Sequence, residues 1–395
     1  MTDLKYDIAS LPDYPALQQL ARALWRNGSV RGASILVGAG LSKNAERPGA
    51  GSPEPPLWWE LLEEMVERLY PHDRKAAPSN PLRIAEEYRT YFGQAGLDDF
   101  LRTRFPDRSW TPGPLHRDLL ELPWEDVLTT NWDTLLERAA ENSVDYSYEV
   151  VRTEADLTYA KSPRIVKLHG TIGDPGPLIF AEEDYRTYPA KYAAFVNFAR
   201  QVFIENELCL VGFSGDDPNF LQWAGWVRDH LGGSARRIYL VGNLRLERAT
   251  RRYLEAHNIA PIDLAPLVNG LPRKLQHAAA TRIFIDELRK AKPVAAHDRE
   301  RHVMEGRAKI FKENNTAQNR PSPAEVVLTE FRVRCLFFTS AIDVHPSSAT
   351  DSTKAYELTV VGLIATPGAQ IASRPAGNHP VAVTPVLPPT QKRLF

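Results

Sequence analysis

Four short motifs carry the side chains of this sequence that are most able to do chemistry. Residues 38–42, Gly-Ala-Gly-Leu-Ser, directly follow the apolar run Ala33–Val37. Glycines at such a strand-to-helix turn let the backbone approach a pyrophosphate closely. Lys43 stands where the third glycine of a full dinucleotide-binding fingerprint would be, so an ordinary glycine turn explains this motif equally well.

The second motif, residues 128–133, reads Leu-Thr-Thr-Asn-Trp-Asp and leads from a strand into a helix predicted over Trp132–Ala140. Thr130 or Asn131 would cap that helix, and Asp133 would favour its first turn. Capping explains each residue singly. It does not explain why polar side chains gather at the carboxyl end of a strand, where open sheets bind their ligands.

A histidine closes the third motif, residues 165–171, which reads Ile-Val-Lys-Leu-His-Gly-Thr. A single histidine is more often a structural residue than a catalyst. Imidazole titrates near neutral pH, however, so His169 is the natural general base if a ribose hydroxyl or a water must lose a proton.

The fourth motif spans residues 209–219, Cys-Leu-Val-Gly-Phe-Ser-Gly-Asp-Asp-Pro-Asn. Asp217 followed by Pro218 predicts the start of a helix, with a capping residue and then proline at the first helical position. The small residues Gly212 and Ser214 leave backbone and hydroxyl groups free to contact a ribose or a phosphate.

Apolar runs alternate with amphipathic stretches, which predicts an α/β fold: a Rossmann-like, doubly wound parallel sheet with an inserted helical subdomain and a C-terminal extension. Short apolar runs predict buried strands, and stretches with a 3.6-residue apolar period predict helices between them. The strands are Ala33–Val37, Asp126–Leu128, Arg164–Leu168, Leu208–Val211 and Ile238–Val241, and the helices are Leu57–Tyr70, Pro189–Ile204 and Asn219–Leu231.

The predicted domain boundary lies near residue 292. Residues 1–292 form the sheet domain, with the helical insertion at about 44–122. Residues 293–395 form the extension, with strands predicted within 326–364, at Val326–Phe338 and Tyr356–Ile364. Residues 367–395 contain six prolines and no acidic residue, which predicts a disordered or extended tail.

The composition argues against several classes of protein. The 48 Lys+Arg nearly balance the 49 Asp+Glu, so no overall basic field indicates nucleic acid as the main ligand. We find neither the apolar core of a signal peptide nor the roughly 18 apolar residues of a membrane helix, and expect a cytoplasmic protein. Cys209 and Cys335, the only cysteines, cannot form a four-cysteine zinc site.

In this order and at strand ends, the motifs resemble those of the sirtuin family. They are most similar to the divergent sirtuin-like domains of bacterial anti-phage defence proteins. The stretches that carry the resemblance are LTTNWDTLLE, IVKLHGTIGD, IFAEEDYRTY and LVGFSGDDPNF, within roughly Ser34 to Ala265. The resemblance implies a Rossmann-like sheet that holds NAD in extended form.

The resemblance also implies roles for particular residues. Asn131 matches the asparagine that positions the nicotinamide ribose and the attacking water, and His169 matches the catalytic base. Asp133 matches the acid beside the nicotinamide. The other matches are to cofactor-binding positions: Gly38, Ala39, Gly40 and Ser42 in the phosphate-binding turn, Thr130 beside the asparagine, Gly212, Ser214 and Asp217 in the loop that holds the adenosine ribose, and Asn243 as the next contact.

Two departures from the family pattern bear on the reaction. Protein-deacylating sirtuins carry Gly-Ile-Pro-Asp-Phe-Arg after the first motif, whereas residues 43–48 read Lys-Asn-Ala-Glu-Arg-Pro, so the usual arginine contact is not carried over. Deacylating sirtuins also use a four-cysteine zinc ribbon to shape the acyl-lysine groove. We therefore expect NAD as the substrate, no zinc or other metal, and hydrolysis of NAD rather than deacylation.

The expected activity is that of an NAD+ glycohydrolase, which releases nicotinamide and ADP-ribose and depletes NAD in abortive infection. Two alternatives stay open: a deacylase or ADP-ribosyltransferase that uses the same site, and a non-catalytic sensor of NAD or an ADP-ribose derivative. An unregulated NADase would harm its host, so we expect a homo-oligomer or a separately encoded partner. The resemblance suggests an ATPase or a short Argonaute-like protein, and we place the interface after residue 292.

Overall fold

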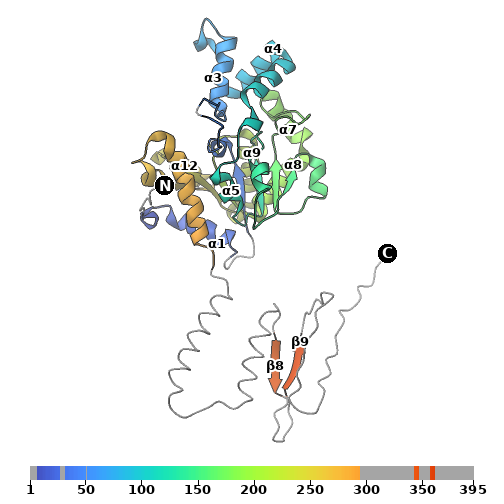
Figure 1. The fold of residues 1–395 in the computed structure, drawn as a ribbon, viewed down its shortest axis with the longest axis vertical. Coiled ribbons are helices and arrows are strands. Elements are labelled where there is room, and N and C mark those ends of the chain that lie inside the picture. The colour runs from blue at the N-terminus through green and yellow to red at the C-terminus, as the bar shows by residue number, and fades with distance from the viewer. Residues whose placement is uncertain (1–6, 27–31, 50, 294–341, 347–355, 361–395) are drawn as a thin grey trace, which may run out of the picture. The chain divides into compact units, whose positions relative to one another are not determined.

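The larger part of the chain is built on a sheet with helices packed around it (Figure 1). The sheet has seven parallel strands in the order β3-β4-β2-β1-β5-β6-β7. The computed structural model describes residues 7–26, 32–49, 51–293, 342–346 and 356–360. Each neighbouring pair of strands in this sheet is parallel, which confirms the predicted α/β class. The strands are β1 (Ala33–Val37), β2 (Asp126–Thr129), β3 (Glu149–Val151), β4 (Arg164–Lys167), β5 (Glu207–Val211), β6 (Ile238–Gly242) and β7 (Ile259–Asp263).

The order of the strands reverses at β1, which lies between β2 and β5. Strands β2, β3 and β4 lie on one side of β1, with β4 between β2 and β3, and the chain then crosses back to add β5, β6 and β7 on the other side. In open parallel sheets, ligands bind outside the carboxyl ends of the strands at such a reversal. Gly38 directly follows β1 and Gly212 directly follows β5, so two of the motifs meet at this point.

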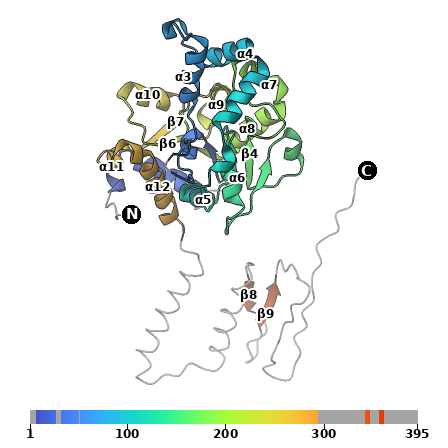
Figure 2. The same ribbon diagram turned by 45° about the horizontal axis from the view of Figure 1, so that its top comes forward.

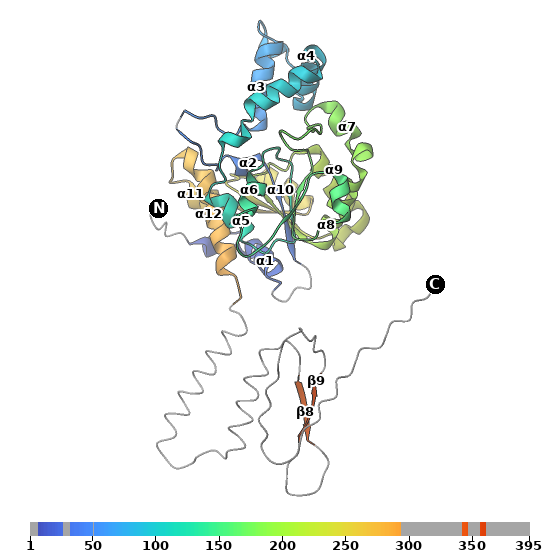
Figure 3. The same cartoon turned by 45° about the vertical axis from the view of Figure 1, so that its right-hand side comes forward.

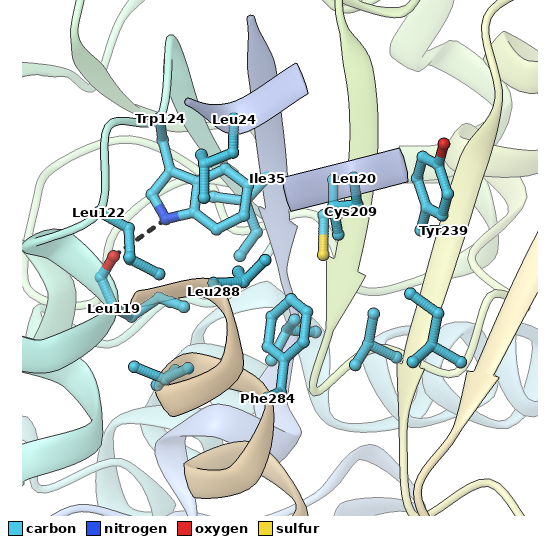
Figure 4. Close-up of a cluster of buried hydrophobic side chains, with 14 of the residues drawn as sticks. Leu20, Leu24, Ile35, Leu119, Leu122, Trp124, Cys209, Tyr239, Phe284 and Leu288 are labelled. Atoms are coloured by element: carbon cyan, nitrogen blue, oxygen red, sulfur yellow. Dashed lines mark hydrogen bonds between the residues drawn. The ribbon is translucent and has the colours of Figure 1, made fainter. Parts of the chain in front are cut away.

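Alternate residues of each strand face opposite layers of helices, because side chains alternate across a pleated strand. Ile35 and Cys209 face one layer, in which Phe284 packs beside them (Figure 4). Leu36 and Leu210 face the other layer. The first layer contains α1 (Tyr14–Leu24), α5 (Pro114–Leu120) and α12 (Arg273–Lys290), and the second contains α8 (Ala193–Glu205) and α9 (Pro218–Leu231).

Between β1 and β2 the chain adds α3 (Trp58–Leu69) and α4 (Pro81–Arg104), which pack on each other beyond the edge of the sheet (Figure 3). Their apolar faces join Trp132 and Phe180 in a third buried cluster, where these two rings lie 5.3 Å apart. Helix α5, at the end of the same stretch, instead lies beside α12 (Figure 2). The stretch 44–122 therefore contributes both to a separate cluster and to a layer of the sheet.

Several boundaries differ from those predicted. The helix predicted over Pro189–Ile204 is two helices, α7 (Glu182–Lys191) and α8, and the helix predicted from Trp132 begins three residues later, as α6 (Leu135–Ala140). Strands β3 and β7 were not predicted. The remaining short elements are α2 (Ala39–Ser42), α10 (Arg248–Ala256) and α11 (Ala265–Val268).

The structure divides into a first unit, residues 1–295, and a second, residues 296–395, in which β8 (Ile342–Pro346) pairs antiparallel with β9 (Tyr356–Val360). Strand β9 lies within the predicted strand Tyr356–Ile364. The predicted strand Val326–Phe338 and the proline-rich residues 367–395 lie outside the described residues. The domain boundary near 292 and the limits of the insertion stay predictions. Among the described residues, no helix combines the length and apolarity needed to cross a membrane.

Candidate active site

The turn after β1 packs backbone to backbone against the loop after β5. Gly38 N donates a hydrogen bond to Val211 O (3.0 Å), and Gly40 N donates one to Gly212 O (2.8 Å). A Cβ on Gly40 would lie 2.8 Å from Gly212 Cα, and a Cβ on Gly212, where φ is +63°, would lie 2.4 Å from the Leu41 nitrogen. The close contact between the two loops therefore requires glycine at both positions, whether or not a ligand binds there.

Ser42, Asn131 and Asp133 form a buried, hydrogen-bonded cluster beside this turn. Ser42 Oγ donates to Asp133 Oδ2 (2.7 Å) and accepts from Asn131 Nδ2 (3.0 Å). These residues are 3%, 8% and 4% exposed for Ser42, Asn131 and Asp133 respectively, so little water competes for their bonds. The resemblance places Ser42 in the phosphate-binding turn, which stays a prediction; in the structure its hydroxyl joins the asparagine to the aspartate.

The loop that carries this cluster is fixed from both ends. Asn131 N donates to Thr129 Oγ1 (3.0 Å), and that hydroxyl donates to Val37 O (2.9 Å), which ties β2 to β1. Asp133 Oδ1 accepts from Leu135 N (3.2 Å) at the start of α6. Asp133 thus serves the first helical turn, whereas the prediction that Thr130 or Asn131 caps the helix is wrong, since the helix begins later.

A buried ion pair between Lys167 and Glu137 also holds the loop that carries Asn131 and Asp133. Lys167 Nζ lies 3.2 Å from Glu137 Oε1 and also donates to the main-chain oxygen of Asp133. The side chains of Lys167 and Glu137 are 0% and 4% exposed. Lys167 ends β4, so this cation connects the strand that leads to His169 with the loop that carries Asn131.

His169 lies buried two residues beyond β4. Its Nε2 is 3.1 Å from Asn219 Nδ2, in the first turn of α9, and the rings of Tyr185 and Tyr188 pack edge-on against it at 5.4 and 5.7 Å. Burial lowers the pKa of His169, and the carboxylates of Asp217 and Asp184 oppose this only in part. The imidazole is therefore neutral near pH 7, as a general base must be.

Asp217 performs the helix-capping role predicted for it. Its Oδ1 accepts from Phe220 N (3.0 Å), and α9 begins at Pro218. Its Oδ2 accepts from the Tyr185 hydroxyl (3.1 Å). Both carboxylate oxygens are therefore engaged within the protein, which leaves less of this side chain for the ribose contact that we predicted.

The register of the sheet relates Asn131 to His169. Thr129 pairs with Lys167 across neighbouring parallel strands, and Asn131 and His169 each lie two residues beyond that pair. Ile172 N donates to Trp132 O (2.8 Å), which holds the two following loops together. Both side chains thus belong to the same edge of the sheet as the glycine turn. That they share one cleft with Gly40 and Ser214 stays a prediction.

The other predicted contacts surround this edge. Ala39, Thr130 and Asn243 are half-buried, and Ser214 is exposed, with its hydroxyl accepting from Asp216 N (3.3 Å). The sequence did not reveal the residues that support the site from behind, Asn219 and His277. Asn219 stood within a quoted motif without a role, whereas His277, whose Nε2 lies 2.8 Å from Gly40 O, is far along the chain and carries no sequence signal.

His116 gives a prediction about pH and stability. Its Nδ1 accepts from Gly113 N (3.2 Å), and burial lowers its pKa to about 4, although Asp133 partly opposes this. The unfolded chain takes up this proton at about pH 6.5, so between these values the unfolded state binds more protons and stability falls as the pH falls. Between about pH 7 and pH 5 we expect His116 to account for a loss of about 2 kcal/mol.

Urea unfolding of the wild-type chain and of His116→Gln across this pH range measures that contribution. We expect the unfolding free energy of His116→Gln to depend less on pH than that of the wild type. A loss of packing around the new side chain would lower this free energy equally at every pH and would not change the slope. The buried His169 adds a slope of the same sign, so some dependence will remain. Equal slopes in the two proteins would show that His116 does not supply the effect.

Comparison with known proteins shows which domain and which proteins this chain resembles. Residues 125–262 match the SIR2-like domain. The chain is 27% identical over 253 residues to "Defense-associated sirtuin 2" of Bacillus subtilis, over 62% of this chain and 24% of that protein. It is 29% identical over 133 residues to "NAD(+) hydrolase ThsA" of Acinetobacter baumannii (strain 532279), over 33% of this chain and 27% of that protein.

Among solved structures, a Sir2 homologue in complex with NAD aligns with 74% of this chain and 100% of its own, at 12% identity and a TM-score of 0.38. The chain spans only about a quarter of the length of the two relatives named above. The match over residues 125–262 includes the Asn131 loop, His169 and the loop after β5. Over residues 125–262 this chain therefore carries a SIR2-like domain, and over 62% of its length it is similar to a defence-associated sirtuin.

Proposed function

We propose that this chain hydrolyses NAD at the bond between nicotinamide and C1′, that it releases nicotinamide and ADP-ribose, and that the resulting loss of NAD serves anti-phage defence. The names of its relatives, a defence-associated sirtuin and an NAD(+) hydrolase, support both parts. The observation that carries the proposal is the pairing of the Ser42–Asn131–Asp133 cluster with a buried, neutral His169 at one edge of the sheet.

The proposed reaction needs positioning and negative charge rather than a strong nucleophile. The C1′–nitrogen bond breaks and its electron pair leaves with nicotinamide, so positive charge develops on the ribose. Asp133 lies beside the bond that breaks, and Asn131, held by Ser42, orients the ribose and the water. The water oxygen then bonds to C1′, and His169 accepts the proton that the water loses.

Incubating the purified chain with NAD and following nicotinamide release tests the proposal. We expect release without any acylated peptide, together with ADP-ribose in equal amount, and no zinc by elemental analysis. If NAD stays intact until an acetyl-lysine peptide is added, the chain is a deacylase. If ADP-ribose becomes attached to a protein, it is a transferase. Binding of NAD without turnover under any condition would leave the sensor alternative.

Asn219 is a positioning residue in this proposal, and its substitution gives a second prediction. An amide N–H that donates to His169 Nε2 leaves the ring proton on Nδ1 and the lone pair on Nε2, and this hydrogen bond must break when Nε2 accepts the proton of the water. Asn219→Ala frees the ring to adopt the other tautomer. We expect turnover to fall about tenfold, the equivalent of one lost hydrogen bond.

Asn219→Asp should be more harmful, because a carboxylate accepts a hydrogen bond from Nε2–H and favours the protonated ring. The acid limb of the kcat/KM profile should therefore move to higher pH in this variant. Activity should decrease in the order wild type, Asn219→Ala, Asn219→Asp. If both variants lose activity equally and keep the wild-type pH profile, Asn219 merely packs in the core.

A further inference from the structure

The loop after β6 presents an arginine near the glycine turn. Two consecutive residues of α12 connect the two places: His277 Nε2 lies 2.8 Å from Gly40 O, while Gln276 Oε1 accepts from Asn243 Nδ2 (3.2 Å) and from the guanidinium of Arg245. Strand β6 is two strands from β1 in the sheet, on the side opposite to β2 and β4. Arg245 therefore belongs to the same edge as the turn.

The backbone of this loop is held in an unusual conformation. Arg245 has φ +51°, a left-handed value that side chains other than glycine rarely adopt. Asp263, the last residue of β7, supports it: Oδ1 accepts from Leu244 N (3.0 Å) and Arg245 N (3.2 Å), and Oδ2 accepts from Leu246 N (3.1 Å). Strain that its surroundings maintain in this way often marks a binding loop.

The charge of Arg245 is not neutralised within the described residues. Its guanidinium contacts only amide oxygens, those of Gln276 and of Asn243, the latter 3.4 Å from Nε. The nearby carboxylate of Asp263 is turned inward to the backbone N–H groups. Arg245 is exposed, so a full positive charge with a planar set of donors faces solvent at this edge.

The placement of Arg245 and Asp263 bears on whether the site prefers NAD or NADP. Asn131 and His169 lie on the β2 and β4 side of the glycine turn, so the adenosine half of an extended dinucleotide lies toward β5 and β6. In dinucleotide-binding sheets, a carboxylate near the adenosine ribose binds the 2′-hydroxyl of NAD, whereas an arginine there accommodates the 2′-phosphate of NADP. Here the carboxylate of Asp263 accepts hydrogen bonds from backbone N–H groups, whereas the guanidinium of Arg245 is exposed.

We propose that Arg245 binds the 2′-phosphate of NADP, and that this site accepts NADP at least as well as NAD. The inference rests on the proposed function in one respect, namely that a dinucleotide binds along the glycine turn. It goes further by naming the substrate class and the residue that sets it.

Equilibrium binding of ADP-ribose and of 2′-phospho-ADP-ribose, measured by calorimetry, tests the proposal apart from catalysis, because neither ligand has a nicotinamide to lose. We expect the wild-type chain to bind the phosphorylated ligand at least as tightly. Arg245→Ala should weaken that binding by about 10- to 100-fold, as for hydrogen bonds to a charged group, and change ADP-ribose binding by less than about threefold.

Two further variants make the result specific. Arg252→Ala removes one positive charge from a side chain that is 87% exposed on α10, and should leave both affinities unchanged. Arg245→Gly suits the positive φ and replaces Arg245→Ala if alanine disturbs the loop.

If the wild-type chain binds ADP-ribose but prefers it tenfold or more over the phosphorylated form, the inference is wrong and the proposed function stands. Equal losses for both ligands in Arg245→Ala would also overturn the inference. If neither ligand binds, the proposed function fails with it.

Discussion

Replacing His169 by alanine is expected to lower the rate of nicotinamide release from NAD by about 10²–10⁴-fold, the range for loss of a general base. The imidazole is buried, neutral and at the carboxyl edge of the sheet, and Asn219 holds its Nε2. Asn131→Ala should have an effect of similar size, because water and ribose would lose the amide that orients them.

The fold should survive both substitutions. Asn131→Ala leaves the Ser42–Asp133 hydrogen bond in place, and so removes only one of the two contacts of the serine hydroxyl. Circular dichroism and thermal unfolding of each variant check this. His230→Ala is the matched control: this histidine is exposed and stacks on Trp226, so its loss should leave turnover unchanged. Turnover within threefold of wild type in His169→Ala would refute the assigned role.

The activity of the wild-type chain should also depend on pH through this histidine. Because burial lowers the pKa of His169, the acid limb of the kcat/KM profile should have its midpoint below the ordinary value of about 6.5. Activity is then complete above that value and is lost as the pH falls and the ring becomes protonated. An acid limb centred above about pH 7 would mean that the limiting base is another group.

The central strands could be predicted from the sequence because they are buried on both faces and therefore read as continuous apolar runs. Strands β3 and β7 escaped prediction because they lie at the two edges of the sheet. Strand β3 is three residues long and only its last residue, Val151, is fully buried. Strand β7 contains Pro261, and proline has no backbone N–H to donate within a sheet. Proline therefore counts against a strand except at an edge, where the backbone groups on the outer side have no neighbouring strand to bond.

The motifs located the candidate site but not the bonds within it. A sequence places Ser42 near a phosphate turn and Asn131 after a strand. It does not reveal that Ser42 Oγ joins Asn131 to Asp133, since those contacts span about ninety positions of the chain. His277 and Asn219 were missed for the same reason. Such supporting residues come from other elements and become visible only when the helices pack.

Breaking the buried ion pair is the second large effect that we expect. Lys167→Met should lower the free energy of unfolding by about 3–5 kcal/mol, because Glu137 would keep a buried charge without its partner. The double variant Lys167→Met, Glu137→Leu should recover much of this loss, since an apolar pair of similar size avoids the desolvation of two charges. Urea unfolding of the three proteins measures both steps.

An exposed ion pair provides the control. Arg252 and Glu255 lie 3.4 Å apart on α10, with side chains 87% and 43% exposed, and Arg252→Met should change stability by less than about 1 kcal/mol. If Lys167→Met were equally mild, the buried pair would not be a determinant of stability, and the loop after β2 would be held by its other contacts.

The double variant also separates stability from activity. Lys167 Nζ donates to the main-chain oxygen of Asp133, and no apolar pair replaces that bond. The oxygen is left without its donor, so part of the stability, about 1–3 kcal/mol, should not return, and the loop that carries Asn131 should lose one of its anchors. We therefore expect nicotinamide release to stay well below wild type at temperatures where the double variant is fully folded. Full recovery of turnover would mean that Lys167 stabilises the core without helping to position Asn131.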